Sequence, residues 1–345
     1  MMIQAVLSNP NHPDYGVVTI PFPIPHDQYA HCMELLEALE IGDAVKADCK
    51  VEKVDSFYTV LKRVEMLTVN VEELNYLAKR LDSFDTGEAS QFQAMAHKRD
   101  LFELKDLINL TFCCQQATVI TDFSDLAAIG RDHYMNLHGG SAGVDELNAL
   151  DGEGTARQLI ESGSGTITPY GVVYDNGMKL EQIYDGRFFP CYYYEPNAIT
   201  VAVTSKSEPE DTEHITWLFL PMVQEEIDRA LLRGGITDSE DVRLRLEDSR
   251  LPNEVDVLLD MEHETLSDFN ELAAATDGLS KADMEKLGAV VMLAKPKSAA
   301  QIKNLAESLD LFDLAPGAHT PQEYGKYMIQ QSGRFEYDEN LDAFY

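Results

Sequence analysis

Near the N-terminus, apolar and polar residues form short runs bounded by turn residues. Residues 3–7 and 16–22 are predicted strands, separated by a turn rich in Asn and Pro. A proline series ends the second strand: Pro21, Pro23 and Pro25. From His26 to Leu39 the apolar residues recur at helical spacing, which predicts an amphipathic helix.

After a mixed segment that extends to Thr68, helical patterns follow one another. They predict helices at about 70–82, 86–98, 100–116 and 122–137, with lengths that suit a small bundle. Residues 139–197 differ in character because they are rich in Gly, Tyr and Phe. Within them, the turn at residues 175–177 lies between apolar runs and predicts a hairpin. We expect a small sheet module here, since the aromatic side chains favour burial.

The second half repeats the order of the first. Residues 198–203 and 215–220 are predicted strands, Pro221 ends the second, and residues 223–232 are a predicted helix. Identical residues recur 195 positions apart: Leu36 and Leu231, Ile41 and Ile236, Met66 and Met261, Asn75 and Asn270, Leu77 and Leu272, Ala78 and Ala273, Ala94 and Ala289, Asn109 and Asn304, Leu110 and Leu305, Gly130 and Gly325. A constant offset over such a length predicts duplication of a whole domain set.

These patterns predict an α+β fold class: an elongated multi-domain chain in which small antiparallel sheets alternate with helical bundles, internally duplicated. Five segments are expected. They are a first strand-helix domain (1–68), a first helical bundle (69–138), a connecting sheet module (139–197), a second strand-helix domain (198–263) and a second helical domain (264–345).

The charge of the chain is strongly one-sided. It has 60 acidic and 27 basic residues, a formal net charge of −33, whereas a net charge of roughly 2 to 8 keeps a small domain soluble. Between Ser205 and Glu271 the balance is 6 − 19 = −13. Because duplex DNA carries about one negative charge per 1.7 Å of axis, an acidic surface of this kind suits the Lys- and Arg-lined groove of a DNA-binding protein. The alternative is an ordinary acidic protein with well-solvated faces.

Some acids also recur at the 195-residue offset. Six pairs match: Asp43 and Asp238, Glu52 and Glu247, Glu65 and Asp260, Glu73 and Asp268, Asp82 and Asp277, Glu88 and Asp283. We take these twelve residues as the candidate partner-binding surface. The other interpretation is that they are the solvent faces of equivalent helices.

Motifs for other chemistry are not found in the sequence. The Gly-rich runs lack the pattern of a phosphate-binding loop, no Ser lies in G-x-S-x-G, and the His residues do not follow zinc-site spacing. We therefore expect no catalytic residue, metal site or cofactor, and no direct binding to nucleic acid. The five Cys residues are sparse and favour reduced thiols. No signal-peptide pattern or long apolar run is present, so we expect a cytoplasmic protein without a membrane partner.

Several stretches resemble ArdA-type antirestriction proteins. They are IQAVLSNPNHPDYGVVTIPFPIP, VNVEELNYLAKRLDSF and DLAAIGRDHYMNLHG in the first half, and ITVAVT, LSDFNELAAATDGL and QEYGKYMIQQSG in the second. This resemblance implies an elongated, DNA-like shape. It also implies binding to the methyltransferase and specificity core of Type I restriction-modification enzymes, whose DNA groove the protein would occupy.

The chain departs from this family in length. Ordinary members are shorter and pair as homodimers, so two tandem copies either stand in for the dimer or form a homodimer in addition. The expected function is thus a stoichiometric, non-enzymatic inhibitor of restriction. Two other readings stay open: an acidic scaffold or adaptor of a mobile element that binds basic proteins, and a hydrolase that uses carboxylates.

Overall fold

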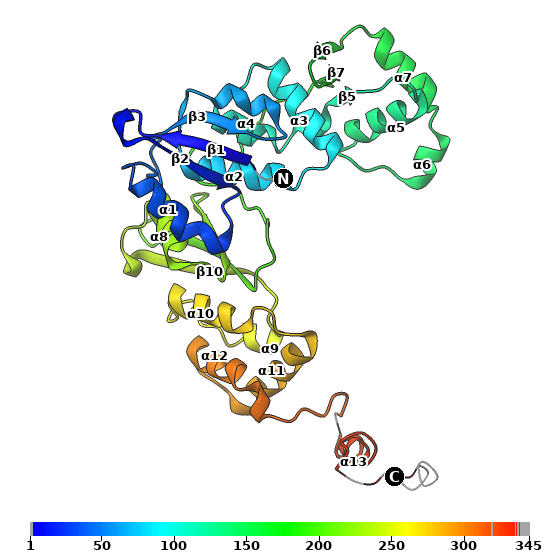
Figure 1. The fold of residues 1–345 in the computed structure, drawn as a ribbon. Coiled ribbons are helices and arrows are strands. Elements are labelled where there is room, and N and C mark those ends of the chain that lie inside the picture. The colour runs from blue at the N-terminus through cyan, green and yellow to red at the C-terminus, as the bar shows by residue number, and fades with distance from the viewer. Residues whose placement is uncertain (1–2, 319, 335, 337, 339–345) are drawn as a thin grey trace. The chain divides into compact units, whose positions relative to one another are not determined.

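A computed structural model of the chain describes residues 3–318, 320–334, 336 and 338 (Figure 1). The chain divides into two compact units. Unit 1 contains residues 1–196 and 201–245, and unit 2 contains residues 197–200 and 246–345. The described residues combine helices with several small antiparallel sheets, which confirms the predicted α+β class.

Unit 1 begins with a four-stranded antiparallel sheet in the order β2-β1-β3-β4. Its strands are β1 (Ile3–Ser8), β2 (Val17–Phe22), β3 (Cys49–Asp55) and β4 (Thr68–Val69). The first two were predicted, and Ala5 of β1 lies opposite Ile20 of β2 and Val54 of β3. Every second residue of β1 is buried, as its apolar alternation predicts.

The sequence pattern does not predict β3 and β4, which lie in the mixed segment before Thr68 and at its end. In β3 the buried residues are Cys49, Val51 and Val54, so the spacing changes from two to three. The change coincides with a register shift opposite Val6 and Leu7 of β1. A bulge of this kind breaks the period-two signal on which strand prediction depends.

Four helices and several 3-10 turns follow or join these strands. They are α1 (Tyr29–Glu37), α2 (Val71–Asp82), α3 (Thr86–Lys98) and α4 (Leu104–Leu110), with η1 (Pro13–Tyr15), η2 (His26–Gln28), η3 (Thr59–Val64) and η4 (Cys114–Gln116). The expected helix over 100–116 is wrong at both ends. Near the end of α4, the Thr111 hydroxyl donates to the Ile108 carbonyl at 2.6 Å, and Arg80 donates to the Thr111 carbonyl at 3.0 Å. These bonds engage backbone acceptors where the helix ends.

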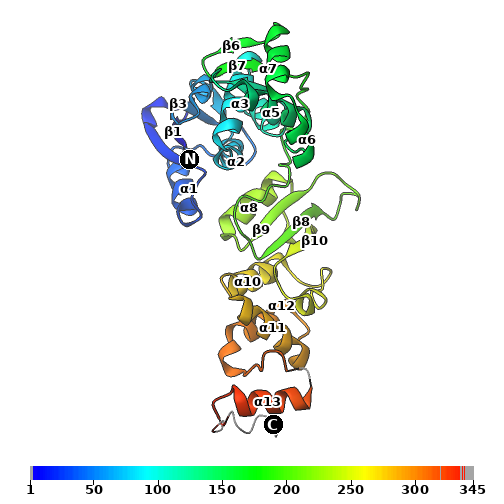
Figure 2. The same ribbon diagram turned by 90° about the vertical axis from the view of Figure 1, so that its right-hand side faces the viewer.

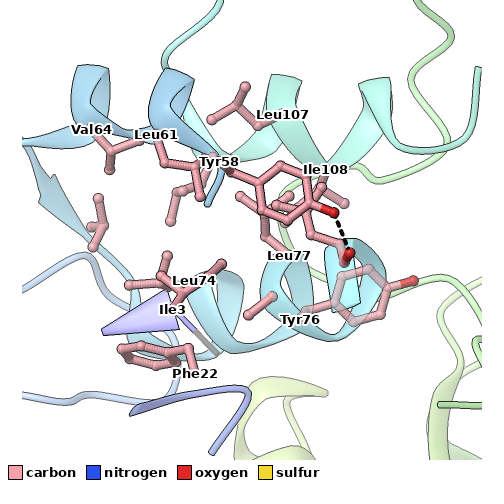
Figure 3. Packing of buried hydrophobic residues seen from close by; sticks show 14 of the residues in the cluster. Ile3, Phe22, Tyr58, Leu61, Val64, Leu74, Tyr76, Leu77, Leu107 and Ile108 are labelled. Carbon is pink, nitrogen blue, oxygen red and sulfur yellow. Dashed lines mark hydrogen bonds between the residues drawn. The ribbon is translucent and has the colours of Figure 1, made fainter. Parts of the chain in front are cut away.

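Part of the core of unit 1 lies between η3, α2 and α4 (Figure 3). Leu61, Leu77 and Ile108 point into it and are at most 1% exposed. Tyr58 is equally buried, and its hydroxyl donates to the Leu81 carbonyl at 2.5 Å. This bond gives the one polar atom of the ring a partner within an apolar environment.

A second, three-stranded sheet in unit 1 has the order β5-β7-β6. Its strands are β5 (Thr118–Ile120), β6 (Thr166–Thr168) and β7 (Gly171–Tyr174). The predicted hairpin around residues 175–177 is wrong: the observed hairpin joins β6 to β7, and no strand is assigned between residues 175 and 198. Residues 175–177 do turn, with Asn176 and Gly177 in the left-handed region, but the chain beyond them packs its aromatic side chains on α2 and α4 instead of pairing as a strand.

Three helices lie beside this sheet: α5 (Leu126–Leu137), α6 (Val144–Ala149) and α7 (Gly152–Glu161), as Figure 1 shows. Helices α5 and α7 share a small core with β5 and β7 that includes Ile129 and Leu159. At the crossing of α5 and α7, a Cβ on Gly130 would lie 1.8 Å from the Gly152 carbonyl oxygen. Only glycine fits at this position, because the two helix backbones touch there.

The second half supplies β8 (Ile199–Ser205), β9 (Thr216–Leu220), α8 (Gln224–Arg233), η5 (Ser239–Asp241) and β10 (Val242–Ser249). The two strands predicted at 198–203 and 215–220 and the helix predicted at 223–232 are thereby confirmed. The strands form a sheet in the order β10-β8-β9. Helix α8 belongs to unit 1, although the sequence places it in the second copy.

Unit 2 is mainly helical in its described part (Figure 2). Its elements are α9 (Asn253–Asp256), α10 (Leu266–Thr276), α11 (Lys281–Ala294), α12 (Ala299–Glu307), η6 (Leu309–Leu311) and α13 (Pro321–Gln330). The fully buried Phe269, Leu272, Leu287 and Ile302 form its core. Among all the described residues, no helix is long and apolar enough to cross a membrane.

The bounds of the elements recur along the chain. Helices α2, α3, α4 and turn η4 begin at residues 71, 86, 104 and 114, and α10, α11, α12 and η6 begin 195 residues later in each case, at 266, 281, 299 and 309. The packing recurs as well: α2 packs on α4 and α3 on α4 and η4, while α10 packs on α12 and α11 on α12 and η6. The recurrence agrees with the predicted duplication, which itself stays a prediction.

Candidate partner-binding surface

The candidate acids of the first copy are bound within their own fold. Asp43 accepts hydrogen bonds from two backbone N–H groups, at 2.8 Å each, and Glu65 accepts one from Val54 at 3.0 Å. Glu52 accepts from the Ser8 hydroxyl at 2.6 Å and from the Lys50 ammonium at 2.9 Å. The Ser8 hydroxyl, followed by Lys50, holds the pKa of Glu52 below its usual value. All three carboxylates are half-buried.

Glu73 lies in the most enclosed of these environments. Its carboxylate accepts a hydrogen bond from the Tyr184 hydroxyl at 2.7 Å and lies 3.8 Å from a guanidinium nitrogen of Arg233. Arg233 extends from α8 and is 4% exposed. The neighbouring Glu72 forms an ion pair of 2.6 Å with Arg229, also from α8. Two of the chain's basic residues therefore neutralise acids of α2 inside unit 1.

Arg233 is held by several acceptors besides Glu73. It donates to the carbonyl oxygens of Ala44 and Arg187 at 2.9 Å each and to Asn70 Oδ1 at 3.0 Å. It also donates to the Tyr184 hydroxyl and lies over the Phe189 ring. Burial raises the pKa of Tyr184, so this phenol stays protonated and bridges the arginine and the carboxylate. We call the group formed by Glu73, Tyr184 and Arg233 the Arg233 latch.

Four of the twelve candidate acids occupy the same kind of helix position. Each is the third residue of a helix, where a carboxylate caps free N–H groups and interacts favourably with the helix dipole. They are Glu73 of α2, Glu88 of α3, Asp268 of α10 and Asp283 of α11. In α3 and α10 the capping box is complete. Helix capping thus accounts for two of the six matched pairs without any partner.

The remaining candidates differ in exposure. Asp82 is half-buried and accepts from the Tyr194 hydroxyl at 2.7 Å. The other four are exposed: Asp238, Glu247, Asp260 and Asp277. Asp260 lies 2.7 Å from His263, which lowers the pKa of the carboxyl and raises that of the imidazole. Seven of the twelve acids belong to unit 1 and five to unit 2.

One further group of exposed acids is not found by sequence matching. Residues 121–165, which contain α5, α6 and α7, carry eight acids and two bases, and all eight acids are exposed. We call this segment the acidic lobe. Its acids are Asp122, Asp125, Asp132, Asp145, Glu146, Asp151, Glu153 and Glu161. A count of acidic and basic residues in successive windows of the sequence detects this segment, because its feature is a local excess of acids and not a match at the 195-residue offset.

Part of the acidic lobe is fixed by helix capping. Asp125 accepts from the Ala128 N–H at 2.9 Å and Asp151 from the Gly154 N–H at 2.9 Å, at the starts of α5 and α7. Of the two bases, Arg157 forms an exposed ion pair with Glu153. The lobe therefore presents a surplus of carboxylates, two of which are held at the starts of helices.

A second row of exposed acids lies along and just after α1. Glu34, Glu37 and Glu40 are spaced by three residues, which places the two helical members on one face of α1. Glu40 follows the helix in the left-handed conformation, with φ of 53°.

The described residues show little that suits catalysis or a cofactor. They contain no group of three or more His, Cys, Asp or Glu placed to hold a metal ion. A hollow of about 330 Å³ is lined by residues that include Arg80, Phe112 and Cys113. The Arg80 guanidinium is stacked 4.3 Å from the centroids of the Phe112 and Tyr192 rings, and burial raises the pKa of the Cys113 thiol. The hollow thus offers neither a free cation nor a reactive thiolate. No protein-family model and no curated protein matches the chain.

Proposed function

We propose that the protein is an acidic DNA mimic that blocks restriction by occupying the DNA groove of a Type I restriction-modification enzyme. The observation that carries the proposal is the acidic lobe, which has eight exposed carboxylates and only two basic residues. The resemblance of the sequence to ArdA-type proteins names the enzyme class. The partner would be the methyltransferase and specificity core, and no catalysis by this chain is involved.

The chemistry of such a groove favours a surface of this kind. Lys and Arg side chains that bind phosphates attract any array of exposed anions, and the attraction weakens as salt rises. The exposed carboxylates of the lobe can be reached by such side chains, as the phosphates of a duplex can. The latch residue Glu73 and the capping residues Glu88, Asp268 and Asp283 contribute to the fold instead.

The test is a competition assay with a Type I methyltransferase core and a labelled DNA duplex. The protein should displace the duplex, and its apparent affinity should fall as ionic strength rises. Replacing Asp132, Asp145 and Glu161 by their amides should weaken displacement roughly tenfold, since exposed ion pairs contribute about 0.2–1 kcal/mol each.

The matched control keeps the charge: Asp132→Glu, Asp145→Glu and Glu161→Asp should displace the duplex as the wild type does. Equal displacement by the amide and the charge-retaining variants would refute a role for the lobe. A stable ternary complex of enzyme, DNA and protein would exclude mimicry altogether and support an adaptor that binds outside the groove.

A further inference from the structure

Unit 2 exposes large apolar side chains close to the end of α11 and in η6. Met292, Leu293 and Leu311 are 64%, 76% and 79% exposed. Large apolar side chains gathered on a surface often mark an interaction site. With the exposed Asn304 of α12, we call them the α11 face.

The residues that lie 195 positions earlier in unit 1 all contact one segment. His97 packs edge-on against the Tyr170 ring at 6.2 Å, and Lys98 forms an ion pair of 2.9 Å with Asp175. The Gln116 carbonyl accepts a hydrogen bond of 2.8 Å from Asn176. These three residues correspond to Met292, Leu293 and Leu311. In unit 1, therefore, the corresponding face is covered by the β6–β7 hairpin and the turn after it.

Asn109 makes the most specific of these contacts. It is fully buried, donates to the Tyr184 carbonyl at 3.0 Å and accepts from the Tyr184 N–H at 2.7 Å. This pair of bonds holds an extended backbone as a neighbouring strand would. Asn304, its counterpart in α12, is exposed. It therefore presents the same donor and acceptor at the surface of unit 2.

The two faces are comparable because the helices that form them pack in the same way. Helix α11 packs on α12 and η6 as α3 packs on α4 and η4. The side chains differ in chemistry. A histidine, a lysine and a glutamine in unit 1 correspond to three large apolar residues in unit 2. The α11 face can therefore bury more apolar area against a covering segment than the face in unit 1 does.

Positive charges beside the α11 face favour a binding segment that carries acids. Lys295 and Lys297 follow α11 directly, and both are exposed. In unit 1, the covering segment carries three acids and two bases, and its aromatic rings include Tyr170 and Tyr184. The acids are Asp175, Glu181 and Asp185, and the bases are Lys179 and Arg187. Methionine also makes favourable contacts with aromatic rings. A segment that bears tyrosine and acids would suit the exposed Met292 and the charges of Lys295 and Lys297.

We propose that the α11 face is a docking site for an acidic, tyrosine-bearing β-hairpin segment of a partner protein. The segment would place a tyrosine ring on Met292 and Leu293, exchange two backbone hydrogen bonds with Asn304 and set its acids against Lys295 and Lys297. The proposal rests on the recurrence of the helices and does not depend on the DNA-mimic function.

The experiment uses the full chain and a labelled synthetic peptide of residues 166–190, the segment that covers the corresponding face of unit 1. Fluorescence anisotropy should show saturable binding of the peptide, whereas a peptide of scrambled sequence should not bind. The double variant Met292→Asp, Leu293→Asp should weaken binding at least tenfold, and Asn304→Ala should weaken it severalfold. Val257→Asp, which changes another exposed apolar residue of unit 2, is the matched control and should bind as the wild type does.

Three outcomes would overturn the proposal. One is the absence of peptide binding, and another is binding that the double variant leaves unchanged while circular dichroism shows both proteins folded. The third is a dimer in sedimentation velocity that the double variant dissociates, because the face would then be occupied by a second copy of the chain.

Discussion

The Arg233 latch gives the most direct prediction about stability. Replacing Arg233 with alanine removes the donor for the carbonyl oxygens of Ala44 and Arg187 and for the Asn70 side chain. The Glu73 carboxylate then keeps its hydrogen bond from the Tyr184 hydroxyl but loses the nearby guanidinium charge. Removing one partner of a buried charged group typically costs about 3–5 kcal/mol. We expect the free energy of unfolding of unit 1 to fall by this amount.

The measurement is urea denaturation followed by the fluorescence of Trp217, the single tryptophan of the chain, which lies in β9 of unit 1. Arg233→Lys should lose less, since it keeps the charge but not the planar fork of donors. Arg157→Ala serves as the control and should leave stability nearly unchanged, because its ion pair with Glu153 is exposed and screened by solvent. A loss below about 1 kcal/mol for Arg233→Ala would show that the buried bonds do not hold α8 to the rest of the unit.

Two further predictions concern the acidic lobe and the pH dependence of stability. Gly130→Ala should destabilise the lobe by about 1–3 kcal/mol, because the added Cβ would meet the Gly152 carbonyl. Hydrogen exchange of α5 and α7 measures this loss. The control is Gly325→Ala in α13, which has open space around it and should be neutral or slightly stabilising. The hydrogen bond from Lys98, followed by that from the Gly177 N–H, lowers the pKa of Asp175. The stability gap between wild type and Asp175→Asn should therefore be present at neutral pH and disappear as the pH falls through that lowered pKa, and a gap that grew on acidification would contradict this sign.

Local signals predicted most of the elements. Asn70 and Asp85 cap α2 and α3, and the apolar spacing that follows each of them is long enough to identify a helix. Pro23 and Pro221 follow β2 and β9, as strand-ending prolines should. Where the local signal is interrupted, prediction was wrong. The bulge opposite Val6 concealed β3, and the hairpin was placed after β7 instead of before it.

The candidate site could be predicted less well, for a physical reason. Glu37 and Glu73 look alike in the sequence, since both are acids on amphipathic helices. Glu73 is enclosed because Arg233 and Tyr184, more than a hundred residues away along the chain, reach it. Long-range neutralisation of this kind has no local pattern. Recurrence was also misleading, because acids at the start of a helix recur wherever the helix recurs.

Helix α8 completes unit 1 but lies late in the chain, and this order has a consequence for synthesis on the ribosome. Tyr184 is made 49 residues before Arg233, a delay of about 2–10 s at 5–20 residues per second. During that interval Glu72 and Glu73 lie side by side on α2 without a guanidinium group, and the Phe189 ring lacks the cation that later lies over it. The nascent first copy is thus complete in its strands and helices but open along one side, and a chaperone or a protease would meet that side before α8 arrives to close it.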